Sequence, residues 1–477
     1  MPTLVVTFVY LGFVAWLFRR DFRERPNITA ALWLPFFWIF ISGSRFVSQW
    51  LAIFGLNWGG TSVEEGSPVD ALVFFILIAS GVRVLYQRRV SLAEFVRHNR
   101  WVTIYLVYCL LAVLWSDFPF VAFKRWFKLF GQPVMVLILL TEPDPMESFR
   151  RLMKRCAYVF VPVSILFIKY FHQWGRGYDI WTGMPANTGI TTNKNSLGCD
   201  LLILGLFFAW HFLRVWRSEK GWTRRTELGL CLGFIAMIGW LLHLANSATS
   251  LGSLVLGVAI MLFLGLKIVD RRRISVYLAT GIVILILADA FFGIHNYVIE
   301  ALGRNSTLTD RTYLWQILLK WNINPVFGAG FESFWLGDRV GKVAEQLGAV
   351  VNEAHNGYLE TYIQLGLLGV FITLALLLAT YFKAHRELLN NFDFGRFRLA
   401  YLGTFIVYNW TEAAFRTHAF PFFMFFLVAI DYPRSQFATV AQPVEADSTE
   451  ADMDLVPTAE QNPSAYNKSA CNDLSHT

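Results

Sequence analysis

The sequence predicts an all-α polytopic membrane protein with twelve or thirteen transmembrane helices and one large loop outside the membrane. Of its 477 residues, 55% are hydrophobic and 17% aromatic, and only 16% are charged. An average soluble domain carries about 25% charged residues. Long apolar runs recur along the chain, and short basic segments separate many of them. This composition excludes a water-soluble globular protein, because so few polar side chains cannot shield the apolar surface.

Thirteen apolar runs reach, or nearly reach, the roughly 20 helical residues that cross a bilayer core. The first run precedes Arg19 and Arg20, whereas a cleavable signal peptide begins with its basic residues, so we expect a retained span. The last run is short, and residues 46–58 could form a re-entrant or interfacial segment. The thirteen runs cover residues 2–18, 29–42, 70–86, 101–115, 126–140, 156–170, 196–213, 227–244, 250–267, 274–292, 357–382, 398–415 and 418–430.

The basic residues predict the orientation of the chain. One set of alternating segments, together with the C-terminal tail, holds 28 of the 41 Lys and Arg residues, and such segments stay in the cytoplasm. The net charge of +7 is therefore mainly an orientation signal and requires no nucleic-acid partner. The opposite segments 43–69, 171–195 and 293–356 then face outward, while the side of the N-terminus depends on the number of spans.

Four regions follow from this pattern. Residues 1–292 are N-terminal transmembrane helices, 293–356 a large outer loop, 357–432 C-terminal transmembrane helices and 433–477 a disordered cytoplasmic tail. The large loop, of about 64 residues, far exceeds the usual connection of about 4–6 residues and therefore predicts a function. The tail is acidic and rich in small polar residues, which is typical of disorder. The chain shows no inverted repeat of the transporter kind.

The cysteines give no sign of a metal or disulfide framework. Four of the five lie in or beside apolar runs, and no two have the spacing of metal ligands. The outer loops also contain no convincing acidic cluster. We therefore expect neither a metal nor another cofactor.

The large loop contains two arginines that are candidates for binding phosphate. Arg311 follows Thr309, a plausible N-cap, and would lie in the first turn of a helix, where amides and the dipole favour an anion. Arg304 lies seven residues earlier. Arginine can bind phosphate through two nitrogens at once. Alternatively, both arginines are ordinary solvated loop residues.

The end of the same loop supplies a candidate proton acceptor. His355 lies at the outer membrane boundary where a helix begins, and histidine exchanges a proton near neutral pH. A neighbouring carboxylate, Glu353 or Glu360, could fix its tautomer and raise its basicity. We expect Gly366 and Gly369 to let another helix approach closely. The alternative is an interfacial histidine without a chemical role.

A second outer segment, residues 189–198, places Lys194, Asn195 and Ser196 at the membrane surface. The lysine and amide could bind a substrate. Helix capping by Asn195 or Ser196 is an equally good interpretation.

Taken together, these motifs resemble the superfamily of bacterial O-antigen ligases and of O-antigen and exopolysaccharide polymerases. The similarity covers residues 185–385 well and the first half of the chain only by hydropathy. Its elements are Arg311 with Leu314-Trp315, the turn Pro325-x-x-Gly328-x-Gly330, and His355-Asn356 followed after nine residues by Gly366-x-x-Gly369.

Some positions depart from the family pattern. Asp310 replaces a frequent Gly and could pair with Arg311, whereas the ligase-type pattern Arg-x-x-x-Leu is met by Arg304 and Leu308. Which of the two arginines is essential therefore stays open. The segments around Gly303–Trp315 and Gly330–Trp335 are most similar to polymerases, which favours polymerase over ligase.

The resemblance implies a GT-C-like membrane glycosyltransferase in the bacterial inner membrane with its active site facing the periplasm. The donor would be a polyprenyl-pyrophosphate-linked glycan. His355 would accept the proton of the attacking hydroxyl, and Arg311 with Arg304 or Lys194 would stabilise the pyrophosphate without a metal. Further expected substrate-binding residues are Asn195, Glu353 and Asn356. Further partners would be membrane lipids and other polysaccharide assembly or export proteins.

Two other functions remain open. A ligase would use the same donor but transfer the glycan to lipid A core. A transporter or flippase of lipid-linked glycan would place ionisable residues within its spans, where Lys128 and Asp289 are among the few candidates. The conspicuous polar residues instead gather outside the spans, which favours chemistry at the interface.

Overall fold

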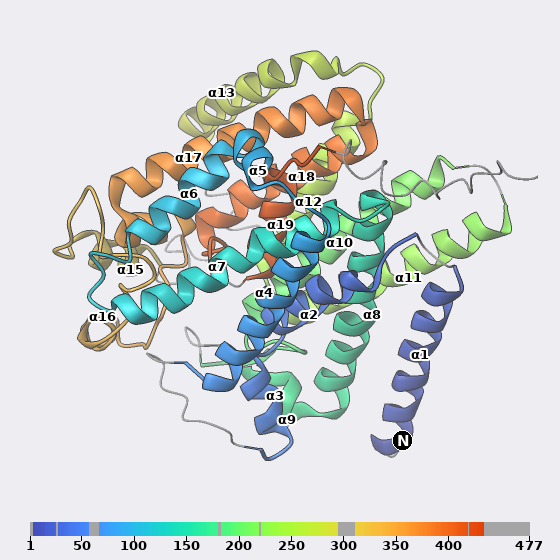
Figure 1. Cartoon of the computed structure of the whole chain (residues 1–477), viewed down its shortest axis with the longest axis horizontal. Coiled ribbons are helices and arrows are strands. Elements are labelled where there is room, and N and C mark those ends of the chain that lie inside the picture. Colours follow the sequence, from blue (N-terminus) through green and yellow to red (C-terminus); the bar gives the residue numbers. More distant parts are fainter. Residues whose placement is uncertain are drawn as a thin grey trace, which may run out of the picture. The chain divides into compact units, whose positions relative to one another are not determined.

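The computed structural model describes residues 3–24, 27–56, 66–179, 183–218, 221–293, 311–417 and 419–433, and these form an almost entirely helical protein (Figure 1). This confirms the predicted all-α class. The predicted C-terminal tail lies outside the described residues. The long helices, in chain order, are α1 (Thr3–Arg23), α2 (Trp33–Gly43), α4 (Pro68–Gln87), α6 (Arg100–Leu111), α7 (Pro119–Leu140), α8 (Pro145–Tyr170), α10 (Lys194–Trp216), α11 (Trp222–Ala245), α12 (Ala248–Leu264), α13 (Ile274–Phe292), α17 (Gly357–Asn390), α18 (Phe392–Thr411) and α19 (Phe420–Ala429).

Shorter elements connect these helices. They are α3 (Val47–Ile53), α5 (Leu92–His98), α9 (His172–Gly175), α15 (Arg311–Leu319), α16 (Asp338–Leu347), the 3-10 turns Ala30–Leu32 and Arg271–Arg273, and the strands β1 (Arg176–Tyr178) and β2 (Pro185–Asn187). The two strands pair antiparallel, with Arg176 opposite Asn187.

Each predicted apolar run overlaps one of the long helices. Among the described residues, five helices are long and apolar enough to cross a membrane, namely α1, α4, α10, α11 and α17. A sixth span is possible where α2, with the 3-10 turn before it, and α3 form a pair bent by 67°, the geometry of a broken span or a re-entrant loop. The protein is thus a multi-pass membrane protein, while the count of twelve or thirteen spans stays a prediction.

Segments that the basic residues assign to one side of the membrane contact one another in the structure. Asp21 of α1 binds Arg151 and Arg155 of α8, each at 2.8 Å. Lys383 of α17 donates to the side chain of Asn99, at 2.7 Å, in the segment between α5 and α6. These contacts join segments that lie far apart in the sequence, as a shared orientation of these segments requires.

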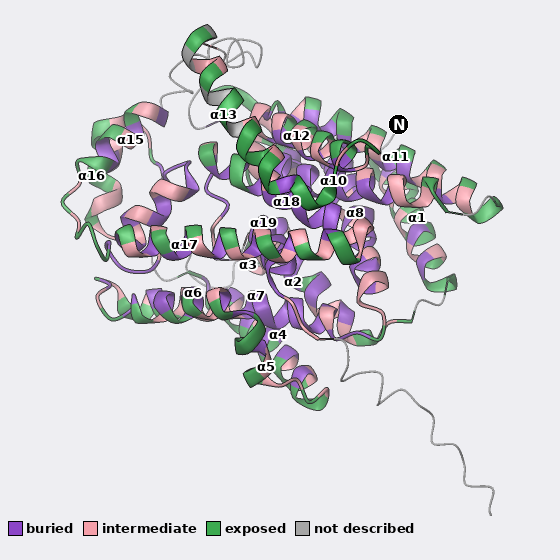
Figure 2. Ribbon diagram, turned by 90° about the horizontal axis from the view of Figure 1, so that it is seen from above, coloured by how far each residue is buried: buried purple, intermediate pink, exposed green. Residues whose placement is uncertain are grey.

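Helix α19 lies at the centre of the protein. All ten of its residues are buried, and Figure 2 shows it surrounded by other helices. A helix that is apolar on every face is stable only when neighbours enclose it. Because α19 contacts α7, α17 and α18, it fixes the position of the chain segment between α18 and α19.

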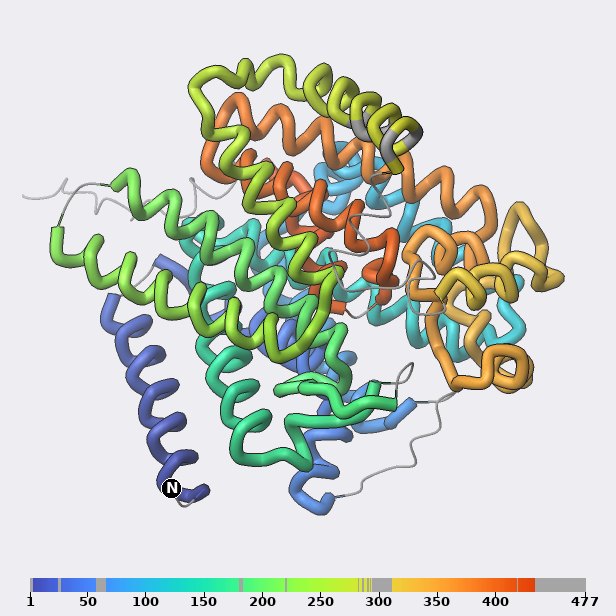
Figure 3. The backbone as a smooth tube through the Cα atoms, turned by 180° about the vertical axis from the view of Figure 1, so that it is seen from behind, coloured from blue at the N-terminus to red at the C-terminus, as the bar shows by residue number. Residues whose placement is uncertain are grey.

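The described part of the large loop forms a lobe against the first turns of α17 (Figure 3). Its small core contains Leu314 and Leu318 of α15, Phe334, and Val343 of α16, and Ile363 of α17 joins the same cluster. This core anchors the loop to a transmembrane helix.

Residues 325–330 of the lobe dock onto a kink in α17. At Gly366 the helix adopts φ 67° and ψ −169°, which frees backbone groups. The amides of Leu367 and Ala329 then donate to the carbonyls of Pro325 and Ile363, each at 2.9 Å. The expectation that another helix approaches Gly366 is therefore wrong, because the kink binds the Pro325–Gly330 turn instead. The Pro325–Gly330 turn and the segment around Gly366 thus bind each other.

We expect Gly366→Ala to destabilise the protein strongly. The backbone conformation at this position is nearly exclusive to glycine and costs other residues about 1–3 kcal/mol. In addition, an added Cβ would lie only 2.1 Å from the carbonyl oxygen of Val326. Thermal unfolding in detergent micelles should show a clearly lower midpoint. The matched control is Gly281→Ala in α13, where a Cβ meets nothing within 4 Å; equal midpoints for the two variants would contradict the docking role.

Candidate functional site

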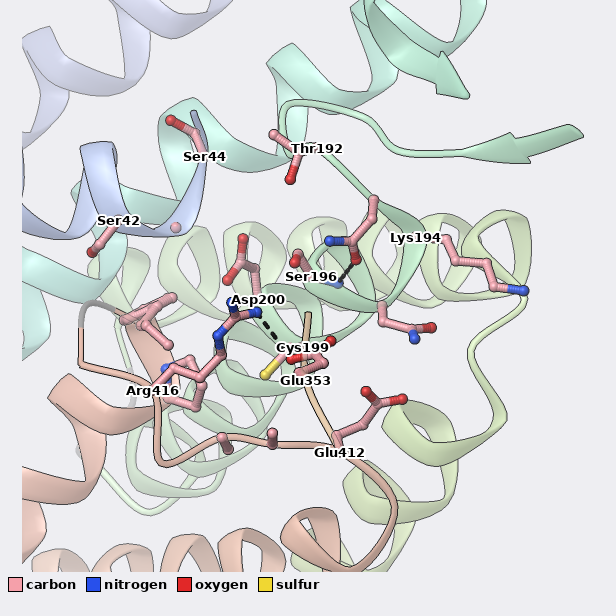
Figure 4. Close-up of a pocket in the computed structure, with 18 of the residues that line it drawn as sticks. Ser42, Ser44, Thr192, Lys194, Ser196, Cys199, Asp200, Glu353, Glu412 and Arg416 are labelled. Atoms are coloured by element: carbon pink, nitrogen blue, oxygen red, sulfur yellow. Dashed lines mark hydrogen bonds and ion pairs between the residues drawn. The ribbon is translucent and has the colours of Figure 1, made fainter. Parts of the chain in front are cut away.

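The three segments predicted to face outward meet around a cavity of about 470 Å³ (Figure 4). Residues 41–49 form one part of the wall, residues 178–200 a second and residues 351–355 a third. The segment between α18 and α19 closes the cavity. Its polar lining includes Ser42, Ser44, Thr192, Lys194, Asn195, Ser196, Asp200, Glu353, His355, Glu412 and Arg416.

His355 lies in this cavity between two carboxylates. Its Nδ1 is 3.3 Å from Glu412 Oε2 and 3.4 Å from Glu353 Oε1, and the residue is only 8% exposed. A neutral imidazole that donates from Nδ1 has Nε2 as its proton-accepting nitrogen. The carboxylates therefore fix the tautomer that a general base needs, and one of them, Glu353, is a partner that the sequence predicts.

The backbone just before His355 is held by two side chains. His355 has a left-handed conformation with φ 49°, which is uncommon outside glycine. The preceding peptide group is fixed because Trp315 Nε1 donates to the Ala354 carbonyl at 2.9 Å, and the Ala354 amide donates to Glu360 Oε2 at 2.7 Å. Glu360 also accepts from Trp335 Nε1 at 2.7 Å. Glu360 thus positions the backbone before the histidine. Among the described residues, no hydrogen bond or ion pair joins the side chains of Glu360 and His355.

Two asparagines near the site are helix caps. Asn356 caps α17, since its Oδ1 accepts from the amides of Tyr358 and Leu359, each at 3.0 Å. Asn193 caps α10 in the same way, so the predicted cap at Asn195 or Ser196 is wrong by two or three positions. Asn195 instead lines the cavity. As substrate-binding residues, Asn195 and Asn356 stay a prediction.

Arg311 begins α15, as the sequence predicts, but its guanidinium binds protein groups. Nη2 lies 2.7 Å from Glu412 Oε1, and Nη1 donates to the backbone carbonyl of Thr411. Burial opposes the charge on Glu412, yet Arg311 and His355 outweigh burial and hold its pKa below the ordinary value. Arg311 therefore acts on His355 through Glu412, which contacts both side chains.

Glu353 is held on its other side by a second arginine. Arg416 Nη1 lies 2.9 Å from Glu353 Oε2, and the charge of Glu353 raises the pKa of Arg416. A continuous row thus runs from Arg416 through Glu353, His355 and Glu412 to Arg311. We call these five side chains the charge row.

The charge row shifts the protonation of His355. Burial lowers its pKa, but the charge of Glu353 and the hydrogen bond and charge of Glu412 outweigh burial, so the pKa of His355 lies above its ordinary value. The histidine is thereby a stronger base than one in water.

The remaining predicted cations have different positions. Lys194, the first residue of α10, forms an ion pair with Asp179 on the cavity wall. Arg304 and the predicted cap Thr309 lie outside the described residues.

Two comparisons show known proteins to which this chain is similar. Residues 232–374 match the family model described as O-antigen ligase. The chain is also 25% identical over 303 residues to the "Exopolysaccharide production protein ExoQ" of Rhizobium meliloti (strain 1021), covering 61% of this chain and 66% of that protein. These matches support the resemblance of the chain to the superfamily of O-antigen ligases and polymerases. The matched region contains Arg311 and His355, whereas Glu412 and Arg416 lie beyond it.

Glu412 and Arg416 are not identified as site residues from the sequence alone. The apolar run 398–415 suggests a span through Glu412, but α18 ends at Thr411, so the glutamate lies just outside the helix. An ionisable residue inside an apparent span is itself a sign of function. The sequence therefore marks Glu412 as a candidate functional residue, but it does not show that Glu412 pairs with His355.

Glu353, His355 and Glu412 could in principle hold a metal ion, since one ligand atom of each lies within 4.8 Å of the others. Arg416 and Arg311, however, bind the same two carboxylates at 2.9 and 2.7 Å. Two guanidinium groups against the ligand oxygens repel a divalent cation and already neutralise the carboxylates. The residues therefore fit a proton-transfer site better than a metal site.

We expect Arg311→Met to lower the free energy of unfolding by about 3–5 kcal/mol, because it leaves Glu412 buried without its cation. Adding Glu412→Gln to this variant should recover part of the loss, since the uncompensated charge is then removed. Denaturant unfolding of the purified protein in micelles measures both. The control is Arg339→Met, which breaks a more exposed ion pair with Asp117 and should cost about 0–1 kcal/mol. A double variant less stable than the single one would contradict the pairing.

Proposed function

We propose that this protein polymerises polyprenyl-pyrophosphate-linked oligosaccharide units into an exopolysaccharide or O-antigen chain at the periplasmic face of the bacterial inner membrane. The observation that carries the proposal is His355, buried in a cavity with its Nδ1 between Glu353 and Glu412. In a general base held at Nδ1 in this way, the second nitrogen, Nε2, is the one that accepts a proton. The match to the O-antigen ligase family model and the similarity to an exopolysaccharide production protein support the reaction class.

The reaction is a glycosyl transfer. A sugar hydroxyl of one lipid-linked unit attacks the anomeric carbon of a second unit, and the new C–O bond forms as the bond to pyrophosphate breaks. His355 Nε2 takes the hydroxyl proton, and the electron pair leaves with the polyprenyl pyrophosphate. The similarity to the family implies inversion at the anomeric carbon. The proton then passes from His355 to solvent or to the departing phosphate.

The charge row has a positioning role in this mechanism. Arg311 holds Glu412, and Arg416 holds Glu353, so both carboxylates keep their positions beside the histidine. Arg416 also lines the cavity and places positive charge near the leaving group, whereas Lys194 is paired with Asp179. Arg304 stays a candidate for the same task. None of these steps needs a metal.

A ligase that transfers the glycan to lipid A core is the second candidate, and the description of the matching family model favours it. A transporter or flippase is a weaker alternative. Its ionisable groups should lie at mid-span, whereas the charge row lies at the ends of α15, α17 and α18.

The proposal is tested with purified protein, lipid-linked repeat units and EDTA. We expect a ladder of products that remain attached to the polyprenyl lipid, with the same yield when Mg²⁺ replaces EDTA. Lipid A core is added in a parallel reaction. Transfer to this acceptor alone, without chain extension, would show a ligase, and loss of activity in EDTA would contradict the metal-independent mechanism.

The pH dependence of kcat/KM tests the base directly. Activity should rise with pH as His355 loses its proton, with a midpoint above the ordinary histidine pKa of 6.5 because the carboxylates raise it. Glu353→Gln removes a charge that raises this pKa, so the midpoint should move to lower pH. Glu345→Gln on the exposed face of α16 serves as the control and should not move it. A midpoint that stays fixed in Glu353→Gln would contradict the role of the pair.

A further inference from the structure

A second cavity of about 550 Å³ lies beside the first, between α4, α7 and the lobe. Its walls are strongly aromatic. Five phenylalanines of α4 and α7 line it, namely Phe74, Phe75, Phe120, Phe123 and Phe127. Several of them are exposed on the apolar surface of the helices, with Phe120 at 72% and Phe75 at 56%. In a bilayer this wall meets lipid chains, so an apolar tail can leave the cavity along it.

One face of α7 adds positive charge to these aromatic walls. Lys124, Arg125 and Lys128 all line the cavity. The ammonium of Lys128 lies 5.0 Å from the ring centre of Phe74 and 5.7 Å from that of Phe46. In the described part of the chain, Lys128 has no carboxylate within 4.0 Å, whereas Arg125 approaches Glu332 at that distance. Lys128 lies in the predicted span 126–140, and Glu332 and Asp70 act on its charge only from beyond ion-pair distance, so it marks a candidate binding site for an anion.

Among the described residues, the two cavities differ in their charged side chains. The first cavity has four carboxyl groups, and its cations Lys194 and Arg416 bind two of them, Asp179 and Glu353. Carboxyl groups accept hydrogen bonds from sugar hydroxyls but repel phosphate. The second cavity has four cationic side chains against only Glu332 and Glu360. An anionic group therefore fits the second cavity, and sugars fit the first.

The two cavities are adjacent. Phe46, Asn352 and Arg416 line both of them. Arg416 thus lies at the junction, within the charge row that holds His355. A molecule with its sugar in the first cavity and its phosphates in the second would place the bond between them near this junction.

We propose that the second cavity binds the pyrophosphate and first isoprene units of the glycan donor, with Lys124, Arg125 and Lys128 around the phosphates. This assignment rests on the proposed function and names where its lipid-linked donor binds. It also explains why a charged residue, Lys128, lies within the apolar run 126–140.

The test is a binding measurement that needs no turnover. Full-length protein in micelles is titrated with a sugar-free polyprenyl pyrophosphate, with the polyprenol of equal length and with inorganic pyrophosphate. We expect Lys128→Met to weaken binding of the polyprenyl pyrophosphate at least tenfold and to leave the polyprenol unaffected. Lys128→Arg should retain most of the affinity. The control Lys342→Met, an exposed lysine of α16 outside both cavities, should bind as the wild type does.

Each outcome decides the assignment. Wild-type affinity in a Lys128→Met protein of unchanged thermal midpoint would overturn it, as would inorganic pyrophosphate that binds as tightly as the lipid. His355→Ala should keep the affinity, because the histidine lies in the other cavity. If the protein binds the lipid through Lys128 but extends no chains, the proposed function fails and the binding site stands. If the wild type extends chains while Lys128→Met binds the lipid normally, the proposed binding site is wrong and the proposed function stands.

Discussion

The buried row Arg416–Glu353–His355–Glu412–Arg311 is the interaction on which the rest of the site depends. Each carboxylate lies between an arginine and the same imidazole nitrogen, so its charge is compensated on both sides. Buried ion pairs stabilise a fold only when the geometry satisfies all the charges, and they are costly when one partner is lost. The row joins the lobe to the segment before α19, and it makes His355 basic.

The sequence motifs that mark the superfamily act mainly as supports for this row. The tryptophan of the arginine motif holds the carbonyl of Ala354, next to His355. The Pro325–Gly330 turn fills the kink at Gly366, which fixes the lobe on α17. Motifs that are far apart in the sequence thus contact the backbone just before His355 and the kink of α17. Only the histidine among them has the geometry of a group that reacts.

Much of the fold and part of the site could be predicted from the sequence. Apolar runs locate helices well, because length and composition are local properties, and His355 with Glu353 is a neighbour pair. Glu412 could not be assigned, since it reaches His355 across 57 residues and only packing around α19 brings it there. The capping role of Asn356 and the cavity around Lys128 likewise depend on tertiary contacts that leave no local pattern.

The most direct test of the mechanism is the rate of a single glycosyl transfer by purified His355→Gln, measured beside the wild type with saturating lipid-linked donor. We expect a loss of at least about 100-fold, the usual contribution of a general base. A matched His243→Gln variant, in an exposed histidine of α11, should react at the wild-type rate. A His355→Gln protein that transfers glycan as fast as the wild type would contradict the assignment of His355 as the base.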